Sequence, residues 1–383
     1  MNKIRLLTVI GARPQIIKAA AISRAIKNKY ADRIEEIILH TGQHYDANMS
    51  QVFFDELGIP QPNFNLGVGS GRHGEQTAKM IEGIEKILLS DNYDGLVLYG
   101  DTNSTLAGAV AASKLHVPIF HIEAGLRSYD LSIPEEVNRI VSDQLASISF
   151  VPTENAMNNM KLEGFEQLKV VFKNGKRRKV CNCGDVMYDN SMYFASLAEK
   201  KSNVLEHYGL KEDGYILSTI HRDNNTDNKD RLTQIFEALI EISERNGIDV
   251  CLPLHPRTKK LLNTNLASEV YQRLMNSSRI RIVPPASFFD IIMLEKNAKI
   301  VMTDSGGVQK EAFFFGKPSI IFLNDTPWKE LTENGAGIAA DANKEKIIGA
   351  YEKMVNHEVR FPHLFGDGHA AEKILGQIED YLK

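Results

Sequence analysis

Short apolar runs alternate along the chain with longer segments in which apolar residues recur every three or four positions. The short runs are typical of buried strands, and the longer pattern is typical of amphipathic helices. In the first half we expect strands at residues 4–10, 35–42, 95–101, 117–125 and 148–153, and helices at residues 14–28 and 104–116. In the second half we expect strands at residues 215–221, 248–256, 279–285, 298–304 and 317–325, and a helix at residues 231–246. Strands that alternate with helices predict parallel sheets with helices on both faces.

The length of the chain and a change of pattern near its middle predict two domains. A chain of 383 residues exceeds the usual size of one domain. Residues 170–185, VVFKNGKRRKVCNCGD, are basic, contain glycine and show no periodicity. We therefore expect an α/β protein with two Rossmann-like domains, the first over residues 1–170 and the second over residues 171–365.

Composition and charge narrow the class of protein. The chain is 43% hydrophobic and 25% charged, as is usual for a globular enzyme. A net charge of −4 without a long basic run argues against nucleic acid as a partner. The N-terminal residues lack the pattern of a signal peptide, and no run of 18 apolar residues occurs, so we expect a cytoplasmic protein without a membrane anchor. Cys181, Cys183 and Cys251 have neither redox nor zinc spacing, and we interpret them as reduced thiols.

Polar residues gather where the expected strands end. In open parallel sheets, ligands bind outside the carboxyl ends of the strands. The conspicuous strand-end segments are residues 11–13, 41–44, 100–101, 123–125, 221–222, 255–256 and 304–307. Two such sheet edges that face each other would enclose a ligand, so the sequence predicts a binding site in an interdomain cleft.

Ser305, Gly306 and Gly307 follow an apolar run and precede a helical segment. Glycines allow backbone N–H groups to approach an oxyanion, and a helix N-terminus attracts negative charge. The alternative is a plain capped turn, since Ser305 is also a good N-cap residue. Arg13, in a strand-to-helix loop, is suited to bind a phosphate as well. The sequence has neither GxxxxGK[ST] nor GxGxxG, which argues against a P-loop or a dinucleotide site.

Acidic residues at other strand ends suggest proton transfer. Asp101 and Glu123 each close an apolar run, and Glu135 and Glu136 follow Pro134 at an expected helix start. Each has a structural alternative: Asp101 as an N-cap, Glu135 and Glu136 as first-turn acids that stabilise a helix. Carboxylates that lie close together raise one another's pKa, which suits acid and base catalysis.

The remaining candidates are basic side chains. Lys18, near the start of the first helix, is either solvated or directed at the site. Of His44, His121, His221 and His255, we place His221 in the site together with Arg222, and we interpret His121 as a buried hydrogen-bonding residue. No HExxH or similar pairing occurs, so we expect no metal.

With these residues in view, the chain resembles the non-hydrolysing UDP-N-acetylglucosamine 2-epimerases, whose fold is glycosyltransferase-B-like. GARPQIIKAA is similar to their GTRPE-(x)₃-K motif, and the family's order is kept by TGQHYD, GDTNSTLAG, HIEAGLRS, PEEVNR, PTENA, TIHRDNN and TDSGGVQKEAFFFGKP. The resemblance extends from residue 4 to about residue 340. It implies a UDP-sugar substrate, no NAD or metal cofactor, and a homodimer.

The resemblance also assigns roles. It implies catalytic positions at Lys18, Asp101, Glu123, Glu135 and His221. It implies that the substrate is bound by Arg13, His221, Ser305, Gly306, Gly307 and Glu311, with Glu311 on the ribose, and we add Arg222 from its position beside His221. It implies that UDP is eliminated to leave a glycal and is then added back with protonation of the opposite face of C2. It further implies that the C-terminal residues 366–383 belong to the first domain, on which residues 370–383 pack as a helix.

Departures from the family leave the sugar open. Residues 43–46 and 75–77 differ from the allosteric segments of activated members, so activation by a second UDP-N-acetylglucosamine is not expected. The segments TGQHYDANMSQVFFDELGIP and LGVGSGRHGEQT are most similar to the subgroup that acts on UDP-2,3-diacetamido-2,3-dideoxyglucuronate for surface polysaccharide. A hydrolysing 2-epimerase that releases UDP, and a glycosyltransferase on the same scaffold, are the alternative functions.

Overall fold

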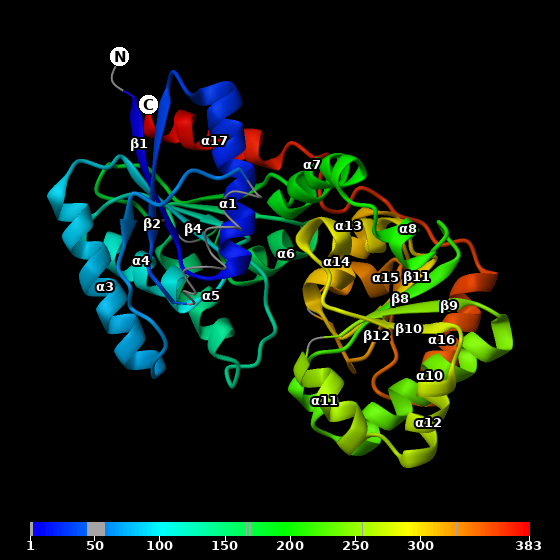
Figure 1. The fold of residues 1–383 in the computed structure, drawn as a ribbon. Coiled ribbons are helices and arrows are strands. Elements are labelled where there is room, and N and C mark those ends of the chain that lie inside the picture. Colours follow the sequence, from blue (N-terminus) through cyan, green and yellow to red (C-terminus); the bar gives the residue numbers. More distant parts are fainter. Residues whose placement is uncertain (1–2, 44–57, 166, 168–169, 255, 327) are drawn as a thin grey trace. The chain divides into compact units, whose positions relative to one another are not determined.

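The computed structural model describes residues 3–43, 58–165, 167, 170–254, 256–326 and 328–383. The chain divides into two compact units. Unit 1 comprises Met1–Asn190 and His363–Lys383, and unit 2 comprises Ser191–Pro362. Each unit is a twisted sheet flanked by helices (Figure 1).

Unit 1 is built on a parallel sheet. Its strand order is β3-β2-β1-β4-β5-β6-β7, and every neighbouring pair is parallel. The strands are β1 (Ile4–Ile10), β2 (Ile34–His40), β3 (Phe64–Asn65), β4 (Gly95–Tyr99), β5 (Ile119–Ile122), β6 (Ile148–Val151) and β7 (Lys179–Asn182). The helices are α1 (Arg13–Ala25), which continues as the π-helix η1 (Ile26–Tyr30), α3 (His73–Ser90), α4 (Asn103–Leu115), α5 (Pro134–Leu145), α6 (Glu154–Leu162) and α17 (Ala370–Leu382).

Alternate residues of the unit 1 strands pack on opposite faces. Leu7 and Val9 of β1 join a core with Met80 and Ile84 of α3. On β5, Phe120 packs edge-on against Tyr381 of α17, with ring centroids 5.8 Å apart. The C-terminal helix is therefore part of unit 1.

The small residues of α4 allow this helix to pack closely against the sheet of unit 1. A Cβ atom on Gly108 would lie 2.6 Å from the Leu98 side chain of β4, so the helix approaches the sheet closely only because this position is glycine. This close approach brings the N-terminal turn of α4 to the strand ends, where Asp101 lies.

Unit 2 repeats the architecture. Its strand order is β10-β9-β8-β11-β12-β13, again all parallel. The strands are β8 (Tyr215–Thr219), β9 (Asp249–Pro253), β10 (Ile280–Val283), β11 (Ile300–Thr303), β12 (Ser319–Ile321) and β13 (Gly337–Ala339). The helices are α8 (Val204–Tyr208), α9 (Asp223–Thr226), α10 (Lys229–Asn246), α11 (Pro256–Asn265), α12 (Ser268–Asn276), α13 (Phe288–Asn297), α14 (Gly306–Phe314), α15 (Lys329–Glu333) and α16 (Lys344–Asn356).

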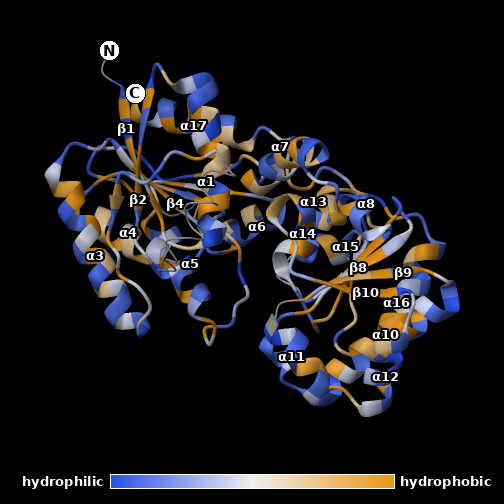
Figure 2. Cartoon of the chain, viewed as in Figure 1, coloured by the Kyte–Doolittle hydropathy of each residue, from blue (hydrophilic) through white to orange (hydrophobic). Residues whose placement is uncertain are grey.

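Two apolar cores cover the two faces of the unit 2 sheet. Ile216 of β8 packs with Phe236 of α10, while Leu217 packs with Leu294 of α13 and Ala312 of α14. Figure 2 shows these strands as mainly hydrophobic and the surrounding helices as a mixture of hydrophobic and hydrophilic residues. Burial on both faces explains why the strands read as continuous apolar runs in the sequence.

The two parallel-sheet α/β domains predicted from the sequence are confirmed, and the segment between them holds a strand that the pattern did not predict. Residues 179–182 form β7, the edge strand of the first sheet, and α7 (Val186–Lys201) runs from unit 1 into unit 2. The sequence placed the boundary at residue 170, whereas the compact units divide after Asn190. Within the described residues, no helix is long and apolar enough to cross a membrane.

Candidate functional site

The carboxyl ends of β1, β4 and β5 lie side by side in unit 1 because these strands are neighbours in the sheet. Asp101 follows β4 and Glu123 follows β5, while Arg13 and Lys18 lie on α1, the helix that follows β1. Arg13 is exposed at the first position of this helix. Four residues that the sequence analysis selected as candidates therefore follow neighbouring strands at one edge of the unit 1 sheet: Arg13, Lys18, Asp101 and Glu123.

Lys18 and Glu123 form an ion pair. Lys18 Nζ lies 2.6 Å from Glu123 Oε1, and only 12% and 10% of the two side chains are exposed. Gly100 lies against this pair, with φ of +60°, and a Cβ atom there would lie 3.2 Å from Lys18 Nζ and 3.4 Å from Glu123 Oε1. Gly100, directly after β4, therefore packs against the Lys18–Glu123 pair at a distance that leaves little room for a side chain.

Glu123 has a left-handed backbone conformation, with φ of +67°. A residue other than glycine pays about 1–2 kcal/mol for this conformation. The neighbouring chain enforces it: Gly100 N donates to Ile122 O at 2.9 Å, and Ala124 N donates to Phe150 O at 3.0 Å. Strain of this kind collects at functional sites, where a side chain must point in one direction.

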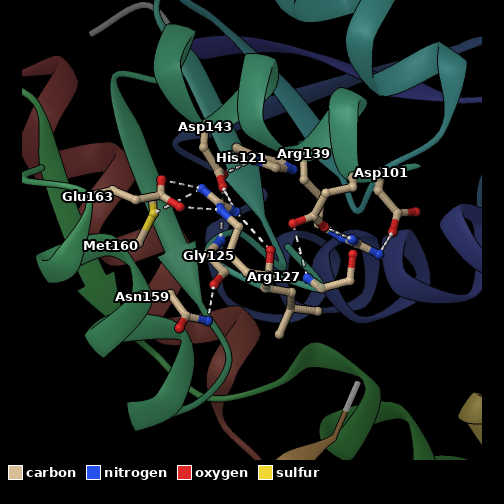
Figure 3. A network of polar contacts seen from close by, with 12 residues as sticks. Asp101, His121, Gly125, Arg127, Arg139, Asp143, Asn159, Met160 and Glu163 are labelled. Atoms are coloured by element: carbon tan, nitrogen blue, oxygen red, sulfur yellow. Dashed lines mark hydrogen bonds and ion pairs between the residues drawn. The ribbon is translucent and has the colours of Figure 1, made fainter. Parts of the chain in front are cut away.

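Asp101 is oriented by a second cation. Arg139 of α5 donates from Nη2 to Asp101 Oδ2 at 2.6 Å (Figure 3). It also donates from Nη1 to Glu136 Oε2. The Asp101 side chain remains 27% exposed, so one carboxylate is both anchored and accessible.

The two adjacent glutamates of α5 differ in their surroundings. Glu136 is fully buried, and its Oε1 accepts from the N–H groups of Ser128 and Tyr129 at 3.0 and 2.9 Å. Burial alone would raise the pKa of Glu136, but the two backbone N–H groups and Arg139 outweigh it and lower the pKa. Glu135, in contrast, is exposed on the first turn of α5. Glu136 is a structural residue, and Glu135 is the one a ligand can reach.

His121 is fully buried and hydrogen bonded at both ring nitrogens, as predicted from its place in an apolar strand. Its Nδ1 lies 2.7 Å from Asp143 Oδ1, and its Nε2 lies 2.7 Å from the carbonyl oxygen of Gly100. His121 thus connects α5 to the loop that carries Asp101.

In unit 2, Asp304 at the end of β11 organises the segment that follows β8. Asp304 is fully buried, and it accepts from the N–H groups of His221 and Arg222 and from Asn225 Nδ2, each at 3.1 Å. His221 Nδ1 lies 3.1 Å from Asp304 Oδ1, and 53% of the His221 side chain is exposed. The Nδ1 edge of the ring thus faces Asp304, and more than half of the side chain is open to solvent. Arg222 is exposed at the N-cap of α9.

Ser305 is the N-cap of α14, and its Oγ accepts from Val308 N. Gly306 and Gly307 form the first turn. A Cβ atom on either would find its nearest neighbour 3.9 Å away, and neither has positive φ. Packing within the chain therefore does not require glycine at these positions. The absence of side chains does leave the first-turn N–H groups accessible to an anion.

Glu311 lies one turn further along α14 and is partly buried. Glu295 of α13 is buried nearby, and burial, together with the charge of Glu311, raises the pKa of Glu295 well above its usual value. The Glu295 carboxyl is therefore harder to ionise than that of an ordinary glutamate.

Two segments named in the sequence analysis fall partly or wholly outside the described residues. His44, Tyr45 and Asp46 of TGQHYD lie there, as does His255, whereas Thr41, Gly42 and Gln43 are described. Glu75, of the second segment compared with activated relatives, is described, and it forms an exposed ion pair with Lys79 at 2.7 Å.

Comparison with known proteins decides the family. The model of the UDP-N-acetylglucosamine 2-epimerase family matches residues 26–379. The chain belongs to the UDP-N-acetylglucosamine 2-epimerase family. Among relatives of this epimerase-family chain, the UDP-2,3-diacetamido-2,3-dideoxy-D-glucuronate 2-epimerase of Pseudomonas aeruginosa is 44% identical over 97% of this chain and 98% of its own. The UDP-N-acetylglucosamine 2-epimerase of Methanocaldococcus jannaschii is 41% identical over the same shares.

Solved structures agree with the family. The Methanocaldococcus jannaschii UDP-GlcNAc 2-epimerase in complex with UDP-GlcNAc and UDP matches this epimerase-family chain with a TM-score of 0.81 at 41% identity, covering 99% of this chain and 100% of the other. A transferase from Siraitia grosvenorii in complex with UDP matches with a TM-score of 0.57 at 12% identity, covering 99% and 95%. The second match concerns the fold alone.

Arg139 and Asp143 of the epimerase-family chain were not singled out by the sequence, and Asp304 was named only within the strand-end segment 304–307, without a role of its own. Each acts through a partner distant in sequence, such as Asp101 for Arg139. Asp304 alone had a signal, because it closes an apolar strand ahead of the glycines.

Proposed function

We propose that the protein is a non-hydrolysing UDP-sugar 2-epimerase that inverts C2 of a UDP-2-acetamido sugar. Its substrate is UDP-N-acetylglucosamine, converted to UDP-N-acetylmannosamine, or UDP-2,3-diacetamido-2,3-dideoxyglucuronate, converted to the mannuronate. One observation carries the proposal. Asp101, Glu123 and Lys18 lie at one strand edge of a chain whose near full-length relatives include 2-epimerases for both sugars.

Unit 1 supplies the acid and base groups in this proposal. The C2 hydrogen of a 2-acetamido sugar is too weakly acidic for simple exchange. A base therefore removes this proton while the C1–O bond breaks and its electron pair leaves with UDP, which gives a glycal. Return of UDP to C1 with protonation of C2 on the opposite face completes the inversion. Asp101, Glu123 and Glu135 are the carboxylates we assign to these proton transfers, and Lys18 holds Glu123 in place.

Unit 2 binds the leaving group in this proposal. The first-turn amides of α14 at Gly306 and Gly307, with the Ser305 hydroxyl, are suited to the diphosphate. His221, whose Nδ1 lies 3.1 Å from Asp304 Oδ1 and whose side chain is 53% exposed, is suited to contact the phosphates through Nε2. Arg222, and Arg13 from unit 1, add cations, and Glu311 accepts from the ribose hydroxyls. Stabilised UDP is a better leaving group and is retained for its return to C1.

The experiment is an assay with both sugars. Purified protein is incubated separately with UDP-N-acetylglucosamine and with the diacetamido-glucuronate, and nucleotide-linked epimer and free UDP are quantified by NMR. We expect epimer from at least one sugar without net UDP. Net free UDP with free mannosamine would support the hydrolysing alternative, and transfer to an acceptor without epimer would support a glycosyltransferase.

Two variants test the catalytic assignment. Asp101→Asn and Glu123→Gln are expected to abolish turnover while UDP affinity, measured by calorimetry, changes little. A near wild-type rate in either variant would remove that residue from the mechanism. We further propose a cytoplasmic homodimer that supplies a precursor of surface polysaccharide. Light scattering tests the dimer.

A further inference from the structure

A cluster of buried charges lies behind Glu123, and the proposed chemistry does not use it. Its members are His121 of β5, Arg127 in the following loop, Asp143 of α5 and Glu163 at the C-terminus of α6 (Figure 3). The side chains of His121, Arg127 and Asp143 are at most 1% exposed. Burial of charges is costly, so a cluster of this kind calls for an explanation beyond stability.

Asp143 is the centre of the cluster. Its Oδ1 contacts His121 Nδ1 at 2.7 Å, and its Oδ2 accepts from Gly125 N at 3.1 Å and from Arg127 Nη1 at 2.7 Å. Burial alone would raise the pKa of Asp143, but these donors outweigh it and lower the pKa. The carboxylate is therefore ionised and committed to three partners.

Two of these partners flank Glu123 in the chain. His121 precedes it by two residues and Gly125 follows it by two. A single carboxylate thus holds both sides of a residue whose φ of +67° is unfavourable. These two anchors add to the backbone hydrogen bonds at Ile122 and Ala124 in holding a conformation that the backbone preference of a glutamate does not favour.

The same cluster reaches the loop of the second carboxylate. The two ring nitrogens of His121 contact Asp143 Oδ1 and the Gly100 carbonyl oxygen, each at 2.7 Å. Gly100 directly precedes Asp101 and lies against the Lys18–Glu123 pair. Asp143 is connected in this way to both carboxylates.

The outer part of the cluster holds Arg127 in place. Glu163 accepts from Arg127 Nε and, at 2.8 Å, from Nη2. Asn159 Nδ2 donates to the Gly125 carbonyl oxygen at 3.0 Å. The Glu163 side chain is 25% exposed, so this pair can be altered without touching either anchor of Glu123.

We propose that Asp143 is a positioning residue for the epimerisation: through His121 and Gly125 it fixes the left-handed conformation of Glu123, and through the Gly100 carbonyl it fixes the loop of Asp101. The proposal rests on the proposed function, because it assumes that Glu123 and Asp101 react. It assigns Asp143 no contact with substrate.

Three variants test it. Asp143→Ala removes both anchors. Asp143→Asn keeps them, because the amide oxygen still accepts from Gly125 and Arg127 while its NH₂ donates to the Nδ1 of a neutral His121, whose Nε2 still donates to Gly100. Glu163→Gln is the matched control, since it weakens the Arg127 ion pair and leaves both anchors in place.

We expect Asp143→Ala to lose about 10²-fold in kcat with UDP affinity unchanged, because misplacement of a catalytic group by about 1 Å has this effect. We expect Asp143→Asn and Glu163→Gln to remain within about threefold of wild type. Equal turnover in Asp143→Ala and Glu163→Gln, or an equal loss in Asp143→Asn and Asp143→Ala, would overturn the proposal. If Asp143→Ala does not fold, His121→Asn takes its place, because it removes the hydrogen bond to the Gly100 carbonyl oxygen. Equal turnover in His121→Asn and Glu163→Gln would then overturn the proposal.

A readout without turnover separates this proposal from the proposed function. The ¹³Cδ resonance of Glu123, assigned with Glu123→Gln, reports the surroundings of its carboxylate. We expect this resonance to shift in Asp143→Ala or His121→Asn and to stay in Asp143→Asn and Glu163→Gln. An unshifted resonance in the first pair refutes the positioning role, whereas an inactive wild type with the expected shifts refutes only the proposed function.

Discussion

A second mutation usually lowers the stability of a protein further. For the Lys18–Glu123 ion pair we predict the opposite: replacing both residues destabilises the protein less than replacing Lys18 alone. The variants are Lys18→Met, Glu123→Gln and the double variant, which keep the approximate volume of each side chain. At 2.6 Å, the gross attraction at an effective dielectric constant of 20 is about 6 kcal/mol, and most of it is offset by the desolvation of two nearly buried groups.

Removal of one partner costs more than removal of both. With side chains 12% and 10% exposed, we take the lower end of the range for breaking a buried pair, about 3 kcal/mol for Lys18→Met. Replacement of both charges costs about 1 kcal/mol, because neither charge then remains buried. Lys18→Met/Glu123→Gln should therefore be about 2 kcal/mol more stable than Lys18→Met, while both are inactive.

Urea unfolding measures this difference. The only tryptophan of the chain, Trp328, lies in unit 2, so its fluorescence serves as an internal control that should not change. Hydrogen exchange of peptides from β1, β4 and β5 reports on unit 1. If the double variant is no more stable than Lys18→Met, the argument is refuted, because loss of Lys18 would then not leave Glu123 as a costly buried charge.

Other expectations follow from the same geometry. Glu135→Gln should abolish turnover without loss of stability, whereas Glu136→Gln should cost about 1–3 kcal/mol at pH 7 in chemical denaturation. Because the pKa of Glu136 is lowered in the folded state, its contribution is present above the ordinary value of about 4.3 and is lost as pH falls through the folded-state pKa, so the two proteins should converge in acid. A constant difference between pH 7 and pH 3 would contradict this. Gly100→Ala should cost about 1–2 kcal/mol and lower kcat more than UDP affinity, which steady-state kinetics can show. Asp304→Ala should weaken UDP binding about tenfold or more through His221, by calorimetry, and unchanged binding would remove that link.

The sequence was most informative about the buried strands. Strands such as β1 and β8 are buried on both faces, so they are continuous apolar runs with nearly correct limits. β7 was missed because it is an edge strand with exposed or partly exposed residues, and β3 because two residues carry no pattern.

From the sequence, only those site residues could be predicted that lie at the ends of the parallel strands. Parallel strands bring their carboxyl ends to one edge, which is why Asp101 and Glu123 could be selected. Their supporting groups could not be, because Arg139 is 38 residues from Asp101, Asp143 is 22 from His121, and no local pattern encodes such contacts. Nor could the sequence distinguish Glu135 from Glu136, since the burial of Glu136 depends on the loop that returns to it.

Deuterium incorporation tests the central claim most directly. The protein is incubated in D₂O with UDP-N-acetylglucosamine and, separately, with the diacetamido-glucuronate, and the products are examined by NMR and mass spectrometry. Elimination and re-addition of UDP predicts a nucleotide-linked manno product with one deuteron, located at C2. Epimer formed without deuterium at C2 would contradict the account, because the C2 proton would then never have been exchanged with a carboxylate of the protein.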